Sequence, residues 1–130
     1  MSLAAFPIVD ADAQTPREGA TSVECLDSST VLYLYGELDL STLDEEHRAM
    51  SCAIAQETPL IVDLSAVQFM DATTIRLLVR SADFVHARGR SFTIRGPSPF
   101  AARLLTICAL DHLVVDGPPV LLAVSDRAGP

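Results

Sequence analysis

The segment Leu60–Leu64 is nearly all apolar, and a helical pattern lies on each side of it. Apolar runs of this kind are typical of strands that are buried on both faces of a sheet. Strands that alternate with helices of this length indicate right-handed crossovers and parallel pairing. The sequence therefore predicts an α/β fold with a small mixed, largely parallel sheet and helices packed on it.

Three further strands are predicted from their apolar patterns. Residues 23–27 and 31–38 are separated by a Ser-Ser-Thr turn, which favours a hairpin. Ser91–Arg95 has the pattern of another strand. Residues 120–124 fit either a strand or a short helix, and the pattern does not decide between them.

Capping residues indicate where the helices begin and end. Ser41, with Asp44 three residues later, resembles a capping box and predicts the start of the first helix. Asp71 precedes the second helix, which we expect to end at Gly89. Ser98–Pro99, an N-cap followed by proline, predicts the third helix. The expected buried stripe of the second helix consists of Ile75, Leu78, Val79, Ala82 and Val85.

A chain of 130 residues, 49% of them apolar, is expected to form a single core. Residues 1–20 mix small, acidic and turn-forming residues, so we expect a flexible N-terminal arm there. The domain is expected to span residues 21–125, and residues 126–130 to form a polar tail.

The charge of the chain bears on the partners it can bind. Nine arginines, no lysine and seventeen acidic residues give a net charge of −8. This balance argues against direct binding of nucleic acid and against an anionic membrane surface. No apolar stretch reaches the roughly 20 residues of a membrane span, so we expect no membrane insertion and a cytoplasmic location.

Neither a metal site nor a catalytic site is predicted. Cys25, Cys52 and Cys108 lack the spacing of metal ligands, and we expect them to be reduced and mostly buried. The three histidines are equally scattered. The sequence has no glycine-rich phosphate loop and no nucleophile elbow. We therefore expect a protein that is not an enzyme and that needs no cofactor.

Two loops carry the polar groups that are candidates for binding. Gly36–Asp39 follows the second predicted strand, and Phe69–Thr74 leads into the second predicted helix. Binding groups of open α/β sheets gather at the carboxyl ends of the strands. We therefore expect these two loops to lie near one another.

Residues within and beside these loops carry a resemblance to a known family. The order of Y-G-E-L-D, then L-I-V-D-L-S-A-V-Q-F-M-D-A-T-T-I, then S-F-T-I-R-G-P-S-P resembles a STAS domain. STAS domains are found in anti-sigma factor antagonists and sulphate transporters. The resemblance covers Val23 to Val115, and within it Asp63 is interpreted as structural.

The resemblance implies a phosphorylation site at Thr73. In regulatory members, the second of two hydroxyl or small residues after the aspartate is phosphorylated by a partner kinase of the anti-sigma type. The family pattern of Asp, Ser, Ser or Thr, and Gly is Asp71, Ala72, Thr73 and Thr74 here, so two positions depart from it. The same resemblance implies partner contacts at Asp39, Asp71 and Thr74.

A phosphate on Thr73 is expected to leave the fold intact, because the first turn of a helix favours an anion. It adds about −1.5 to −2 charge beside Asp71 and Asp39, which is enough to release a partner. The alternative interpretation is that Thr73 and Asp71 only cap the helix.

One face of the second helix is predicted to point away from the core. At about 100° per residue, Thr73, Leu77, Arg80 and Phe84 share that face. We expect Leu77 and Phe84, flanked by Arg76 and Arg80, to form a protein-binding surface. The alternative is that another element of the same chain covers the two apolar side chains.

The resemblance thus implies an anti-sigma factor antagonist-like regulatory binding protein. Its expected partners are a histidine-kinase-like anti-sigma factor and a PP2C-like phosphatase that resets it. A second possibility is a non-catalytic STAS subunit of a signalling assembly or of an ABC-type transporter, without a phosphorylation switch. A small-molecule or nucleotide sensor is the third, because this fold hosts different functions.

Overall fold

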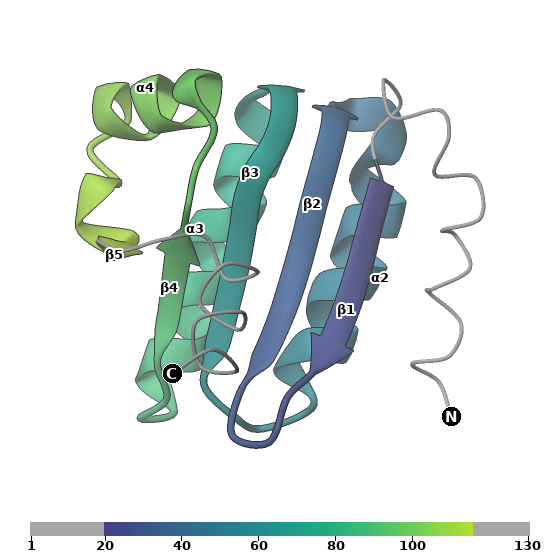
Figure 1. The fold of residues 1–130 in the computed structure, drawn as a ribbon, viewed down its shortest axis with the longest axis vertical. Coiled ribbons are helices and arrows are strands. Elements are labelled where there is room, and N and C mark those ends of the chain that lie inside the picture. Colours follow the sequence, from purple (N-terminus) through teal and green to yellow (C-terminus); the bar gives the residue numbers. More distant parts are fainter. Residues whose placement is uncertain (1–19, 116–130) are drawn as a thin grey trace, which may run out of the picture.

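A computed structural model of the chain describes residues 20–115. Its sheet has five strands, which lie in the same order as in the chain (Figure 1). β1 pairs antiparallel with β2, and all other neighbouring strands are parallel. The predicted α/β fold with a mixed, largely parallel sheet is confirmed. The strands are β1 Ala20–Cys25, β2 Thr30–Leu38, β3 Leu60–Met70, β4 Phe92–Arg95 and β5 Val114–Val115.

Two long helices cover one face of this sheet. α2 (Leu43–Ile54) and α3 (Ala72–Ala87) lie side by side behind it in Figure 1. α4 (Pro99–Ile107) lies near the end of the sheet at which β3 ends. Two short 3-10 helices complete the described part, η2 (Leu40–Thr42) before α2 and η3 (Asp111–Leu113) before β5.

The core lies between the sheet and the two long helices. The apolar strand predicted at the centre of the fold is buried, since Leu60, Val62 and Leu64 have no exposed surface. From α3, Leu78, Ala82 and Val85 pack into the same core, as the predicted stripe requires. Burying such a side chain stabilises the fold by roughly 1.5–3 kcal/mol.

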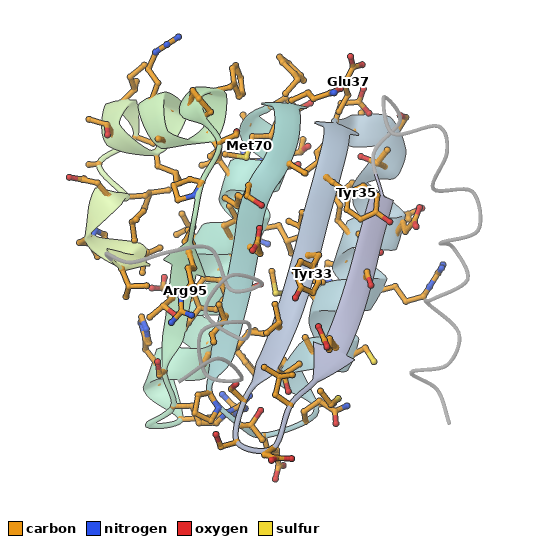
Figure 2. All side chains as sticks on the ribbon, in the orientation of Figure 1. Tyr33, Tyr35, Glu37, Met70 and Arg95 are labelled. Atoms are coloured by element: carbon orange, nitrogen blue, oxygen red, sulfur yellow. The ribbon has the colours of Figure 1, made fainter. Side chains whose placement is uncertain are left out.

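The opposite face of the sheet carries polar side chains, among them Tyr33 of β2 and Arg95 of β4 (Figure 2). The Tyr33 hydroxyl donates to Glu24 at 3.0 Å, and burial together with this carboxylate raises the pKa of Tyr33. The buried Asp63 carboxylate accepts hydrogen bonds from the Ser65 hydroxyl and backbone N–H at 2.6 and 2.8 Å. These bonds agree with the structural role expected for Asp63.

Helix ends were predicted well, with one exception. Gly89 adopts a φ of 75°, a left-handed conformation that suits glycine after α3. Ser98 caps α4, accepting from the Ala101 N–H at 3.2 Å. The capping box expected at Ser41 and Asp44 is wrong. Asp39 caps the 3-10 helix η2, which precedes α2, and Thr42 at the N-cap of α2 forms no capping hydrogen bond with its side chain.

The strand bounds differ from the expectation mainly in β3. It continues past Leu64 to Met70 and stays paired with β2 on both sides of two register shifts, so that Leu38 lies opposite Met70. Register shifts in this pairing break the alternation of buried and exposed residues. β1 starts at Ala20, and η3 and β5 were not expected. The predicted arm, the tail and residues 120–124 lie outside the described residues.

The cysteines do not follow the prediction of burial. Cys25 and Cys108 are exposed and Cys52 is half-buried, and all three are free. Burial raises the pKa of the Cys52 thiol. Among residues 20–115, no three His, Cys, Asp or Glu side chains cluster as metal ligands would. No helix in the described part is both long and apolar enough to span a membrane.

Candidate functional site

The carboxyl ends of β2 and β3 bring the two predicted loops together. The Asp71 N–H donates to the Leu38 carbonyl at 3.2 Å, so the loop after β3 is bonded to the end of β2. Asp71 also accepts a hydrogen bond from the backbone of Leu40. The expectation that the loops are neighbours is confirmed.

Asp71 and Thr73 form the start of α3. Thr73 is half-buried; its hydroxyl donates to Asp71 Oδ1 at 2.5 Å and its N–H to the same oxygen at 3.0 Å. Partial burial opposes the ionisation of Asp71, but hydrogen bonds from Thr73 and from the backbone of Thr74 and Leu40 outweigh it and lower the Asp71 pKa. Asp71 is therefore a charged cap that holds the Thr73 hydroxyl in place.

A buried carboxyl group that was not predicted from the sequence lies beneath this pair. Glu46 of α2 has no exposed surface. Its Oε1 accepts from the Thr74 hydroxyl at 2.8 Å, and its Oε2 from the Thr42 hydroxyl at 2.6 Å. Burial raises the pKa of Glu46; these bonds oppose the rise, and the carboxylates of Asp71 and Asp39 add to it.

Glu46 thus joins the start of α3 to the loop before α2. Thr42 extends the link, because its Oγ1 also accepts from the Asp39 N–H at 2.9 Å. The sequence did hold a signal: Glu46 lies three residues after Leu43 and four before Met50, which places it on the inward face of α2.

The structure separates the residues expected to contact a partner into two groups. Arg76, Arg80 and Phe84 are exposed, Phe84 by 44%. Leu77 is only 9% exposed and belongs to the core, so the expectation that it points away from the core is wrong. Thr74 has no exposed surface, so the expected direct partner contact is also wrong. Both side chains are covered because α2 lies alongside α3.

Apolar side chains surround the loops and were also missed. Leu40 is 69% exposed, directly after Asp39. Phe69, two residues before Asp71, is exposed and packs on Phe100, with ring centroids 5.6 Å apart. Exposed apolar groups beside polar ones are typical of protein-binding surfaces. The sequence signal of Leu40 and Phe69 was their position beside Asp39 and at the start of the second loop.

Replacing Asp71 with alanine tests its role as a cap. We expect Asp71→Ala to lower the free energy of unfolding by about 1 kcal/mol, because the first turn of α3 loses its acceptor. Urea denaturation followed by circular dichroism measures the change. The control is Asp83→Ala, which removes an exposed carboxylate from the same helix and is expected to leave the midpoint nearly unchanged. Equal midpoints for the two variants would contradict the assignment.

A family model described as MlaB, STAS domain, matches residues 21–116. The chain belongs to the STAS domain family. STAS domains are typically non-catalytic binding domains. No curated protein sequence matches this STAS chain.

Solved structures show the same fold. The anti-sigma factor antagonist SpoIIAA in its unphosphorylated form has a TM-score of 0.67 and 22% identity over 85% of this STAS chain and 98% of its own. An anti-sigma factor antagonist from Mycobacterium paratuberculosis has a TM-score of 0.72 and 25% identity, over 85% of this chain and 95% of its own. The murine anion transporter Slc26a9 matches with a TM-score of 0.55 and 16% identity, over 97% of this chain and 25% of its own.

Proposed function

We propose that this STAS protein is a non-catalytic binding protein of the anti-sigma factor antagonist type, controlled by phosphorylation of Thr73. In this proposal it binds a histidine-kinase-like anti-sigma factor in the cytoplasm and thereby frees a sigma factor. The observation that carries the proposal is the position of Thr73, half-buried in the first turn of α3 with its hydroxyl held by Asp71. The similarity to the mycobacterial anti-sigma factor antagonist supports it.

The surface around Thr73 suits a protein partner. Leu40 and the tilted ring pair of Phe69 and Phe100 offer apolar contacts beside the carboxylates of Asp39 and Asp71. Apolar and aromatic side chains at the centre of an interface commonly supply most of its binding energy. In the proposal these residues anchor the partner, and Thr73 lies within its reach.

Phosphorylation of Thr73 replaces an attraction with a repulsion. The hydroxyl that donates to Asp71 becomes a phosphate of about −1.5 to −2 charge beside the same carboxylate. The dipole of α3 favours an anion at its first turn and limits the damage within the domain. A partner that binds the unphosphorylated surface meets the added negative charge directly. Like charges placed opposite one another across an interface weaken binding by several kcal/mol.

Substitutions at Thr73 test the switch. The tagged full chain is used to purify the anti-sigma factor from the native host, and partner and phosphosite are read by mass spectrometry. We expect one phosphate on wild-type Thr73 after incubation with the partner and ATP, and none on Thr73→Ala. Thr73→Glu is expected to weaken binding at least ten-fold, which corresponds to about 1.4 kcal/mol.

Thr106→Glu is the matched control, because Thr106 is an exposed threonine of α4. We expect it to bind like the wild type. A PP2C-like phosphatase is expected to remove the Thr73 phosphate and restore binding. A partner that binds equally well to wild type and Thr73→Glu, and transfers no phosphate, contradicts the switch. That result favours a STAS subunit of a signalling assembly or of an ABC-type transporter.

A further inference from the structure

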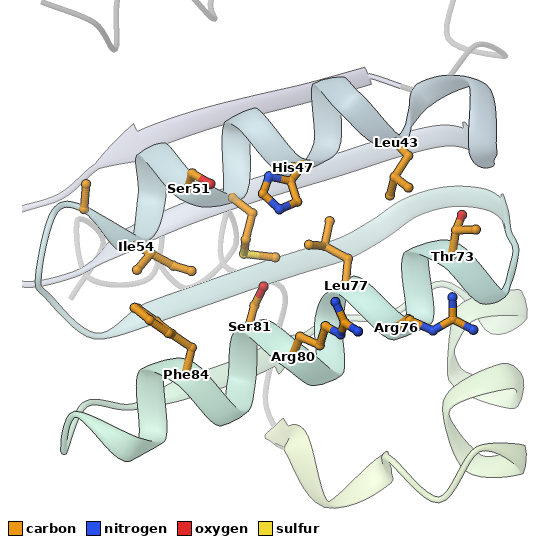
Figure 3. A pocket seen from close by; sticks show the side chains of 12 residues that line it. Leu43, His47, Ser51, Ile54, Thr73, Arg76, Leu77, Arg80, Ser81 and Phe84 are labelled. Atoms are coloured by element: carbon orange, nitrogen blue, oxygen red, sulfur yellow. The ribbon is translucent and has the colours of Figure 1, made fainter.

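A groove of about 650 Å³ runs between α2 and α3 (Figure 3). Ile54 and Phe84 face one another at one end of it, and Leu43 and Thr73 lie at the other. Its volume is within the range of about 300–1,000 Å³ that small-molecule sites occupy. The groove is thus large enough for a ligand, and it reaches the residue proposed as the switch.

The floor of the groove is formed by apolar side chains that are nearly buried. Met50 of α2 and Leu77 of α3 belong to the floor, yet Met50 is only 1% exposed and Leu77 9%. The two helices therefore approach closely beneath the groove. A helix, with a diameter of about 10–12 Å including side chains, would rest on the rim and leave the floor uncovered. A slender apolar chain fits the space better.

The charged residues that line the groove are all basic. They are Arg76 and Arg80, with the imidazole of His47 nearby, and no carboxylate of residues 20–115 lines the groove. This excess of positive groups is notable in a chain with a net charge of −8. Arg76 and Arg80 lie one turn apart on α3 and are exposed, and neither forms an ion pair within residues 20–115. Figure 3 shows Arg80 reaching toward the middle of the groove.

We propose that the groove between α2 and α3 binds a fatty acid, with its alkyl chain on the apolar floor and its carboxylate held by Arg76 and Arg80. The planar guanidinium groups match a carboxylate and form strong charge-assisted hydrogen bonds with it. The chain extends toward Ile54 and Phe84, where the groove is lined by apolar side chains. The fatty acid binds the unphosphorylated protein, so this inference does not rest on the proposed switch at Thr73.

Because Thr73 also lines the groove, the two sites are expected to interact. A negative charge at Thr73 lies one helical turn from Leu77 and beside Arg76, so it competes with the carboxylate for that arginine. Thr73→Glu is therefore expected to weaken the binding of a fatty acid several-fold. This binding measurement needs no kinase, so its result does not depend on the test of phosphorylation at Thr73.

Titration calorimetry with dodecanoate, kept below its micelle-forming concentration, tests the proposal on the full chain. We expect saturable binding of one molecule per chain. Arg76→Ala and Arg80→Ala are each expected to weaken it roughly ten-fold, the effect of losing one charge-assisted bond. Ser51→Phe places a ring in the groove from an exposed position and is expected to abolish binding. Arg103→Ala, an exposed arginine of α4, is the control and is expected to bind like the wild type.

Three results would overturn the proposal. The first is a lack of saturable binding by wild-type protein. The second is binding that the arginine and Ser51→Phe variants leave unchanged, since dodecanoate then binds elsewhere. The third is tighter binding of dodecyl phosphate or of an acidic amphipathic peptide than of dodecanoate, which would assign the groove to a lipid phosphate or to a protein. Circular dichroism of each variant shows that the fold is retained.

Discussion

Leu77→Asp is expected to unfold the protein, whereas Phe84→Asp is expected to leave it folded. Leu77 is 9% exposed and packs in the core, so its replacement buries a carboxylate without a partner. Such a substitution costs on the order of 4 kcal/mol or more, a large part of the total stability of a typical domain. Urea denaturation followed by circular dichroism measures both variants.

Phe84 serves as the matched control for Leu77, because both are apolar residues predicted to share one face of α3. Phe84 is 44% exposed, and the Arg88 guanidinium lies 3.6 Å from the centre of its ring. Phe84→Asp loses this contact, worth about 0.5–1 kcal/mol at an exposed site, but places a carboxylate near the same arginine. Its stability is expected to change by about 1 kcal/mol or less. Equal destabilisation of the two variants would contradict the difference in burial.

Glu46→Ala is the second substitution with a large expected effect. It removes the acceptor of two threonine hydroxyls, and the Thr74 hydroxyl has no access to water. An unsatisfied buried polar group costs about 1–3 kcal/mol, and the space left by the side chain adds to this. We expect a loss of about 2–4 kcal/mol. Glu46→Gln keeps hydrogen-bonding groups at both positions, so it is expected to retain most of the stability.

The same residue is expected to make stability depend on pH. Burial raises the pKa of Glu46 above its ordinary value of 4.5, so the folded protein holds this proton more tightly than the unfolded chain does. The contribution of this group to stability is therefore complete below about pH 4.5 and is lost as the pH rises through the raised pKa. The unfolding free energy of the wild type, relative to Glu46→Gln, is expected to fall over that range.

Urea midpoints between pH 4 and pH 8 measure this difference. The contributions of titrating groups that both proteins contain cancel when their unfolding free energies are compared. Glu45→Gln is the control, since it removes one negative charge from the adjacent, more exposed position of α2. The unfolding free energy of this variant is expected to change with pH in the same way as that of the wild type. A constant difference between wild type and Glu46→Gln at all pH values would show that Glu46 keeps the same charge in the folded and unfolded protein.

The sheet and the helix ends could be predicted because their signals are local. An apolar run identifies the central strand around Val62, and Gly89 and Ser98 mark helix ends through their own backbone and side-chain chemistry. It could also be predicted that Asp39 and Asp71 lie near one another, since parallel strands end at the same edge of a sheet.

The errors arose where a second element decides the outcome. A helical stripe describes the face that packs on the sheet, but α2 also lies beside α3 and widens the buried part of α3 to include Thr74 and Leu77. The sequence around those two residues does not indicate where α2 lies. The start of α2 was missed because the 3-10 helix η2 precedes it, so that the capping side chain is Asp39, at the start of η2. Glu46 was overlooked because its partners, Thr42 and Thr74, are brought together only by the packing of two helices.

The agreement between strand order in space and strand order in the chain has a consequence for biosynthesis. Within residues 20–115, no strand made late has to be inserted between two that are already paired. During translation, at about 5–20 residues per second, each strand that leaves the ribosome finds its neighbour already made. Among the described strands, the sheet can grow outward from the β1–β2 hairpin in one direction, and the last of them to be added is the two-residue strand β5, so little open edge awaits completion once β4 is in place.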